Sequence, residues 1–190
     1  MPVKMLAFCR FGKYHDIEVE DDVTAYFEYP NGATGVFITT TGEAPGTNRL
    51  EIAGDRGKVV LEGGKITFTR TEMSVREFSR INKATFGRPD VWHIEVPVPA
   101  GNGPQHAGIT QNFVDAILDG APLIARAEEG IHSLELANAM LYSTFQGRAV
   151  DLPLDAAGYE AQLKKLIATS RFEKKTVAAG PTDVRTSFGS

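Results

Sequence analysis

The fold of this chain is decided by residues 23–41, which read VTAYFEYPNGATGVFITTT. β-Branched and aromatic residues dominate both halves of the segment, and residues Pro30–Gly32 separate them. An Asn-Gly pair between two such runs favours a β-hairpin in which Asn31 and Gly32 both have φ > 0. We therefore expect two adjacent antiparallel strands here.

Further strands follow at once. Residues 48–69 read NRLEIAGDRGKVVLEGGKITFT, in which the turns Gly54–Gly57 and Glu62–Lys65 separate three short β-rich runs. Because short loops bring consecutive strands side by side, the sequence predicts an antiparallel meander within one continuous sheet. Residues 1–11 and 91–96 are also expected to form strands, whereas residues 72–84 fit either a short helix or an irregular crossover.

After residue 103 the apolar period changes from two to about 3.6 residues, which is typical of helices. Helices are expected near residues 109–119, over residues 127–147, and after Asp155, a candidate N-cap. Strands followed by helices indicate an α+β fold, a large open and mostly antiparallel sheet with helices on one face.

The second face of the sheet also carries apolar residues. Val36 and Ile38 alternate with Phe37, so large apolar side chains point to both sides of the same strand. Since the helices cover only one face, we predict that a second copy of the chain packs on the other, giving a homodimer or tetramer.

Composition excludes several classes of function. The chain has 190 residues, a net charge of −4 and a pI near 5.6, and no basic stripe that would bind nucleic acid. Its apolar runs are too short to span a membrane. Cys9 is the only cysteine, which rules out an intrachain disulfide and a cysteine metal cage. These features favour a cytoplasmic location.

The residues by themselves identify no catalytic, cofactor-binding or metal site. Gly101-Asn102-Gly103 lacks the third glycine of a dinucleotide fingerprint, and no Gly-x-Ser-x-Gly nucleophile motif occurs. No two histidines have the i, i+4 spacing of a helical metal pair. The acidic residues between Glu18 and Asp22 are interpreted as a solvated turn in the connector that leads into the first hairpin.

Several motifs in the chain nevertheless occur together in one known protein family. The runs are Ile17–Asp21, Tyr29–Gly35, Leu50–Gly57, His106–Ile117, Leu134–Met140 and Val150–Leu154. In this order and spacing they resemble the C-terminal domain of the glucose–fructose oxidoreductase, inositol dehydrogenase and rhizopine-catabolism family (Gfo/Idh/MocA). The resemblance implies a domain over residues 1–170 followed by a tail, residues 171–190.

The resemblance further implies the substrate-binding and oligomerisation domain of an NAD(P)-dependent sugar or polyol oxidoreductase. The family's N-terminal Rossmann domain binds NAD or NADP, and its glycine motif, Glu-Lys-Pro lysine and Asp-x-x-x-His pair have no counterpart here. The chain is therefore expected to bind no cofactor and to be inactive by itself. Two alternatives remain open: a standalone binding or scaffold module, and one subunit of a split enzyme whose Rossmann domain is a separate chain.

Three residues are candidates for contact with a sugar or polyol substrate. Arg10 and His15 lie in the segment leading into the hairpin, and His106 precedes a helix that would face the pocket. For each of them, an ordinary solvated side chain is the alternative. A third hypothesis, an independent enzyme using His15, His106 and the acidic residues near Glu20, would require these side chains to converge in one pocket.

Overall fold

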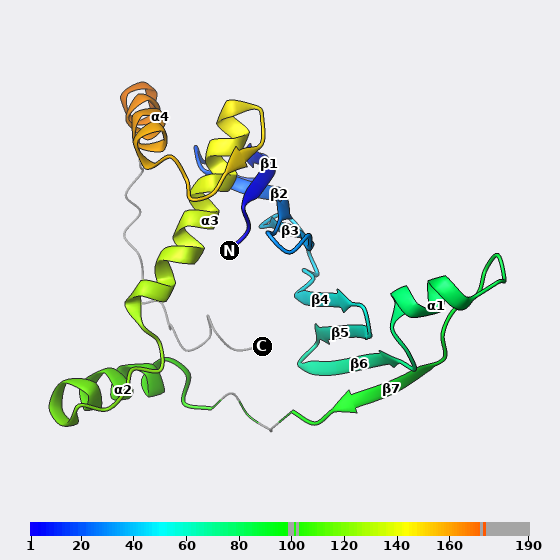
Figure 1. Cartoon of the computed structure of the whole chain (residues 1–190). Helices are drawn as coiled ribbons and strands as arrows, with labels where there is room; N and C mark the ends of the chain where they lie inside the picture. Colours follow the sequence, from blue (N-terminus) through cyan, green and yellow to red (C-terminus); the bar gives the residue numbers. More distant parts are fainter. Residues whose placement is uncertain (99–100, 102, 172, 174–190) are drawn as a thin grey trace. The chain divides into compact units, whose positions relative to one another are not determined.

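The computed structural model describes residues 1–98, 101, 103–171 and 173. Its backbone separates into two compact units, Met1–Gly42 with Ala127–Ser190 and Glu43–Arg126, which are described one at a time below. Figure 1 shows the order of the elements along the chain. The domain predicted over residues 1–170 stays a prediction, and the predicted tail, residues 171–190, lies almost entirely outside the described residues.

The first unit contains a four-stranded antiparallel sheet with strand order β3-β2-β1-β8. Its strands are β1 (Lys4–Phe11), β2 (Glu20–Glu28), β3 (Thr34–Thr40) and the short β8 (Val150–Asp151). The hairpin expected from residues 23–41 is confirmed, with Ala25 opposite Phe37 and Tyr26 opposite Val36. β2 begins three residues before the predicted run, so Glu20–Asp22 belong to the strand and not to a connector.

The turn of this hairpin differs from the predicted one. Gly32 has φ of +80°, but Asn31 is not in the left-handed region. The Gly32 N–H donates to the Tyr29 carbonyl oxygen, and the Tyr29 N–H donates to the Ala33 carbonyl oxygen. This is the three-residue loop of a type I turn followed by a left-handed glycine. Pro30 explains the difference, because its ring holds φ near −65° and suits the position after Tyr29 in a type I turn.

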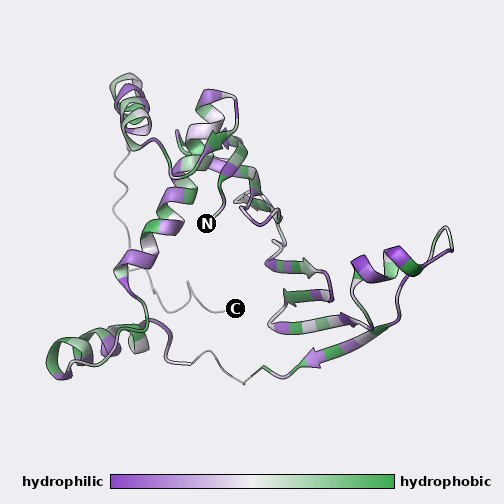
Figure 2. Ribbon diagram, viewed as in Figure 1, coloured by the Kyte–Doolittle hydropathy of each residue, from purple (hydrophilic) through white to green (hydrophobic). Residues whose placement is uncertain are grey.

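The second unit contains another four-stranded antiparallel sheet, in the order β4-β5-β6-β7. Its strands are β4 (Arg49–Gly54), β5 (Gly57–Glu62), β6 (Lys65–Thr71) and β7 (Val91–Val96), and the undecided segment contains a short helix, α1 (Val75–Ile81). Hydropathy alternates along these strands (Figure 2). Leu61 pairs with Leu50 and Ile66, and Glu62 on the other side of the strand pairs with Arg49 and Lys65. One face is therefore apolar, and the other is mostly polar or charged.

The prediction of one continuous sheet is wrong for the part of the chain that the structure describes. The meander and the hairpin belong to separate hydrogen-bonded sheets. The physical reason lies in the loop between β3 and β4. Tight turns force the strands within each sheet to pair, whereas residues 41–48 form a longer connector with two glycines and a proline, which imposes no pairing on its flanking strands.

The helices are α2 (Gln105–Asp119), α3 (Ala127–Gln146) and α4 (Ala156–Thr169). Asp155 caps α4 as predicted, because its carboxylate accepts the Gly158 N–H at 3.0 Å. None of the helices in the described residues is long and apolar enough to cross a membrane.

Helix α3 covers one face of the first sheet, which confirms the predicted α+β arrangement. The core between them consists of Met5, Ala7, Ala25, Phe27, Ala139 and Val150. Two hydroxyl groups of α3 also bond to the backbone of β1. Ser143 Oγ accepts the Ala7 N–H at 3.0 Å, and Thr144 Oγ1 accepts the Cys9 N–H at 2.9 Å. These bonds satisfy backbone groups along the part of β1 that extends past β8.

Candidate functional site

A pocket of about 500 Å³ lies in the first unit between the sheet and α3. Its size falls within the range of small-molecule sites. The inward alternation of β2 and β3 supplies Val23, Phe27 and Phe37, while α3 supplies Leu136 and Met140. Further lining residues, mostly polar and gathered at the strand ends, are Cys9, Glu20, Asp21, Asp22, Tyr29, Thr39, Thr40, Thr41, Ser133, Ala137 and Leu141.

Asp21 organises the polar end of this pocket. Its carboxylate accepts the backbone N–H groups of Lys13 at 2.9 Å, Tyr14 at 2.7 Å and His15 at 3.0 Å. The side chain is almost fully buried, with 1 % of its surface exposed. The interpretation of this region as a solvated acidic turn is therefore wrong for Asp21. Three N–H donors replace the water that a buried carboxylate would otherwise need.

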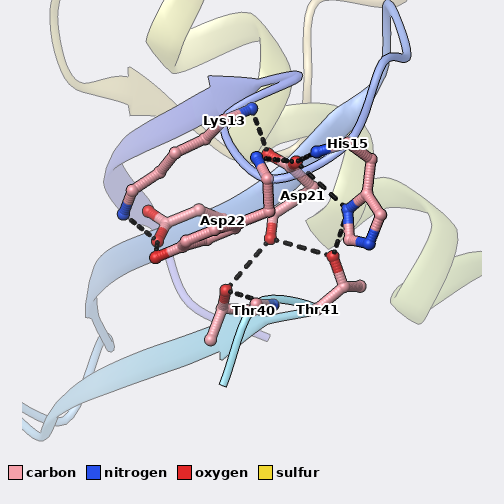
Figure 3. A network of polar contacts seen from close by, with 8 residues as sticks. Lys13, His15, Asp21, Asp22, Thr40 and Thr41 are labelled. Atoms are coloured by element: carbon pink, nitrogen blue, oxygen red, sulfur yellow. Dashed lines mark hydrogen bonds and ion pairs between the residues drawn. The ribbon is translucent and has the colours of Figure 1, made fainter. Parts of the chain in front are cut away.

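The residues around Asp21 form a connected polar rim (Figure 3). The hydroxyl groups of Thr40 and Thr41 donate to the Asp21 carbonyl oxygen at 3.1 and 3.4 Å. Lys13 Nζ contacts the Asp22 carboxylate at 2.6 Å, and this hydrogen bond raises the pKa of Lys13. The rim thus ties the loop after β1 to the adjoining ends of β2 and β3.

His15 is the predicted site residue that the structure brings to this rim. Its Nδ1 lies 3.4 Å from the Asp21 carboxylate and 3.2 Å from Thr41 Oγ1, and about half of its side chain is exposed. Both neighbours line the pocket. His15 is therefore held beside the pocket by two residues that belong to it.

The other two candidates do not line this pocket. Arg10 follows Cys9 on β1, and because side chains alternate along a strand, it projects from the face opposite the pocket-lining Cys9. His106 lies at the start of α2 in the second unit, beside a separate pocket that also involves Pro104 and Ile124. The pocket of the first unit therefore includes neither residue.

Sequence reasoning did not select Asp21, Thr40 or Thr41. The contacts that make Asp21 important are hydrogen bonds from backbone N–H groups six to eight residues earlier, and any residue except proline could have supplied them. The sequence does contain one usable signal. Asp21 and Asp22 directly precede the β-rich run that starts at Val23, so one of the two carboxylates must point to the inward face of the strand, where charged residues are unusual.

Comparison with known proteins identifies the family. Residues 7–152, about three quarters of the chain, match the Gfo/Idh/MocA family described as "Oxidoreductase family, C-terminal alpha/beta domain". The chain belongs to this family. No curated protein matches the chain significantly.

Solved structures show the same fold as this Gfo/Idh/MocA C-terminal domain. The WlbA dehydrogenase from Chromobacterium violaceum, in complex with NADH and UDP-GlcNAcA, is 24% identical with a TM-score of 0.56, over 81% of this chain and 41% of that one. An oxidoreductase from Thermotoga maritima is 18% identical with a TM-score of 0.58, over 80% and 41%. The aldose-aldose oxidoreductase from Caulobacter crescentus, complexed with glycerol, is 20% identical with a TM-score of 0.55, over 80% and 41%. The domain spans about two fifths of these chains.

The described part of the Gfo/Idh/MocA domain contains no Rossmann-type site for a dinucleotide. A Rossmann site needs parallel strands and a glycine loop that places the pyrophosphate at a helix N-terminus. Every pairing between the described strands is antiparallel. Nor do the described residues bring together three His, Cys, Asp or Glu side chains that could hold a metal ion.

The pKa of Asp21 makes the rim sensitive to acid. Burial alone would raise this pKa, but the N–H donors of Tyr14, Lys13 and His15 and the imidazole of His15 lower it from 3.8 to about 2. A carboxyl group whose pKa is lower in the folded state stabilises the fold above its unfolded pKa. That stabilisation is lost as the pH falls through the folded pKa.

We therefore expect the loop to loosen between about pH 4 and pH 2. The protection of the Lys13, Tyr14 and His15 amides from hydrogen exchange, relative to the intrinsic exchange rate at each pH, should fall through this window. In Asp21→Asn the same amides should have lower protection factors at pH 7, and these factors should change little between pH 4 and 2. Equal acid dependence in the two proteins would contradict the role of the Asp21 carboxylate.

Proposed function

We propose that this domain is the substrate-binding and oligomerisation part of an NAD(P)-dependent sugar or polyol oxidoreductase, with nicotinamide bound by a separate Rossmann domain. The family match over residues 7–152 carries the proposal. Related structures support it, since one contains NADH with a nucleotide sugar and another contains glycerol. The substrate would occupy the pocket between the first sheet and α3, with the Asp21 rim as its polar end.

The lining of this pocket suits such a ligand. Sugars and polyols have apolar C–H faces and many hydroxyl groups, so a site for them combines apolar walls with a few placed polar groups. Phe27, Phe37 and Leu136 provide walls, and the Thr40 and Thr41 hydroxyls lie at one end. Arg10 and His106 are not among the residues that line this pocket. They would contact substrate only where another part of a complete enzyme supplies the rest of the site.

The proposal predicts which ligands the isolated chain binds. Hydride transfer requires the nicotinamide to lie against the substrate carbon, and the described residues form no Rossmann-type dinucleotide site. NADH fluorescence should therefore stay unchanged when this protein is added, and a mixture with NAD and D-glucose should form no NADH. D-Glucose itself should bind and shift the NMR signals of Val23, Phe37 and Met140.

Two results would contradict the proposal. A saturable change in NADH fluorescence would show a dinucleotide site in this chain. Glucose shifts spread over both units, with none concentrated around the pocket, would remove the assigned substrate site. If NADH binds once a separate Rossmann-domain chain is added, the protein is one subunit of a split enzyme. In that form of the proposal the two halves of the oxidoreductase are separate subunits.

A further inference from the structure

The contacts of His15 also determine which of its two ring nitrogens carries the hydrogen. An ionised carboxylate has no hydrogen to donate, so it only accepts hydrogen bonds. The Asp21 carboxyl group, with its pKa of about 2, is ionised at neutral pH. Its Oδ2 atom lies 3.4 Å from Nδ1 of His15. If Nδ1 carried no hydrogen, its lone pair would face the carboxylate lone pairs at this distance. The carboxylate therefore favours the form in which Nδ1 carries the hydrogen.

Thr41 is compatible with the same form. Its Oγ1 atom lies 3.2 Å from His15 Nδ1 and 3.4 Å from the Asp21 carbonyl oxygen. A hydroxyl group can donate one hydrogen bond and accept others. When Thr41 donates to the Asp21 carbonyl, its oxygen remains free to accept from Nδ1. Both neighbours of Nδ1 can thus act as acceptors at once.

The other ring nitrogen is then left as an acceptor. The hydrogen bond made by one nitrogen of a histidine sets the state of the other. In Figure 3 no dashed line reaches Nε2 of His15, which lies farther from Asp21 than Nδ1 does. About half of the His15 side chain is exposed, so a ligand can reach the imidazole ring.

We propose that Asp21 and Thr41 hold His15 as its Nδ1–H tautomer, so that Nε2 accepts a hydrogen bond from a hydroxyl group of the bound ligand. Asp21 and Thr41 are positioning residues in this arrangement, and His15 is the residue that touches the ligand. The ligand class is an uncharged polyhydroxylated molecule, because its hydroxyl groups supply the donor that Nε2 requires. The ligand contact rests on the proposed function, whereas the tautomer does not.

The tautomer can be measured without any ligand. At about pH 8, where an ordinary imidazole is neutral, the ¹⁵N shifts of the ring should show a protonated Nδ1 and an unprotonated Nε2 in His15. His93 provides an internal control, because its Nδ1 lies 3.3 Å from Thr69 Oγ1, a group that can either donate or accept. A mixture of tautomers is expected there. A predominant Nε2–H form of His15 would overturn the inference.

Variants test the two positioning residues separately. Asp21→Asn replaces the acceptor by an amide that can donate to Nδ1, and should shift His15 toward the Nε2–H form. Thr41→Val removes the hydroxyl but keeps the shape and the carboxylate, so Nδ1–H should remain the main form. Unchanged ring shifts in Asp21→Asn, with the loop still folded, would overturn the assigned role of the carboxylate. If Asp21→Asn fails to fold, the ¹⁵N ring shifts of His15 in the wild-type protein still test which tautomer is present.

The ligand contact is tested with D-glucose. His15→Phe keeps a ring but loses Nε2, and should raise the dissociation constant for glucose about fivefold, the effect of one hydrogen bond. His93→Phe is the matched control and should leave the constant unchanged. Glucose binding that is unaffected by His15→Phe would overturn only the acceptor role. Absence of glucose binding in the wild-type protein would overturn both the acceptor role and the proposed function.

Discussion

Replacing Met5 with alanine is expected to lower the free energy of unfolding of the first unit by about 3 kcal/mol, the usual cost of truncating a large buried side chain. Met5 has no exposed surface, and it packs with Ala7, Ala25, Phe27 and Ala139 where β1 and β2 meet α3. Several of its neighbours are alanines, which have no side-chain freedom to close the gap. The cavity would therefore persist, and its cost would add to the lost burial.

Urea denaturation followed by far-UV circular dichroism measures this change, and hydrogen exchange at the amides of β1 and β2 assigns it to the first unit. Met5→Leu is the matched control, because a swap of similar volume should cost less than about 1.5 kcal/mol. Substitution of the exposed neighbouring residue, Lys4→Ala, should change the free energy of unfolding little. A loss below 1 kcal/mol for Met5→Ala would contradict the description of this core.

The effect should extend to the pocket. The walls of the pocket are the face of the first sheet and α3, and the same core residues hold these two elements together. Met5 does not itself line the pocket. Weaker glucose binding in Met5→Ala than in Met5→Leu would therefore report on the packing of α3, and not on a lost ligand contact.

Much of the fold could be predicted because local patterns determine local structure. The alternation from Val23 to Thr41 predicts β2 and β3, and the alternation from Arg49 to Thr69 predicts β4, β5 and β6. The cap at Asp155 was predicted because a carboxylate bonding the N–H three residues later is a local event. Such features depend on neighbours in the sequence, so one sequence is enough to find them.

The errors arose where a competing local preference or a distant contact decided the outcome. Pro30 changed the type of the hairpin turn that Asn31 and Gly32 favoured. β3 and β4 are consecutive strands but do not pair, because the long loop over residues 41–48 does not hold them side by side. The site was the hardest part. Asp21 acts through backbone groups of the preceding loop, and the sequence does not show which backbone groups will meet which side chain.

The second large expected effect concerns assembly, through the face of the first sheet that is turned away from α3. The strand register places Leu6, Tyr26 and Val36 in one row across β1, β2 and β3, and Phe8 and Ile38 in the next row with Thr24 between them. Phe8, Val36 and Ile38 are each at least 60% exposed. Monomeric proteins rarely leave a continuous apolar surface of this kind in water, and a two-fold axis lets one such patch cover itself in a second copy.

We therefore expect the wild-type protein to dimerise through this face, and a charge placed at its centre to separate the subunits. Ile38→Glu would bury an unpaired carboxylate in each half of the interface, and should raise the dimer dissociation constant at least a hundredfold. The fold of each subunit should be unchanged, because Ile38 is 70% exposed within it. Sedimentation velocity over a range of concentrations measures the constant, and circular dichroism checks the fold.

Ile167→Glu separates this effect from a general effect of added charge. Ile167 lies on α4 in the same unit and is 67% exposed, so the two substitutions change the same residue type at nearly equal exposure. Only Ile38→Glu should weaken the dimer if the face of β1, β2 and β3 forms the interface. A wild-type protein that sediments as a monomer at tens of micromolar, or equal weakening by both substitutions, would contradict this assignment. Weakening by Ile167→Glu alone would move the interface to α4, and the row of Leu6, Tyr26 and Val36 would then need another partner.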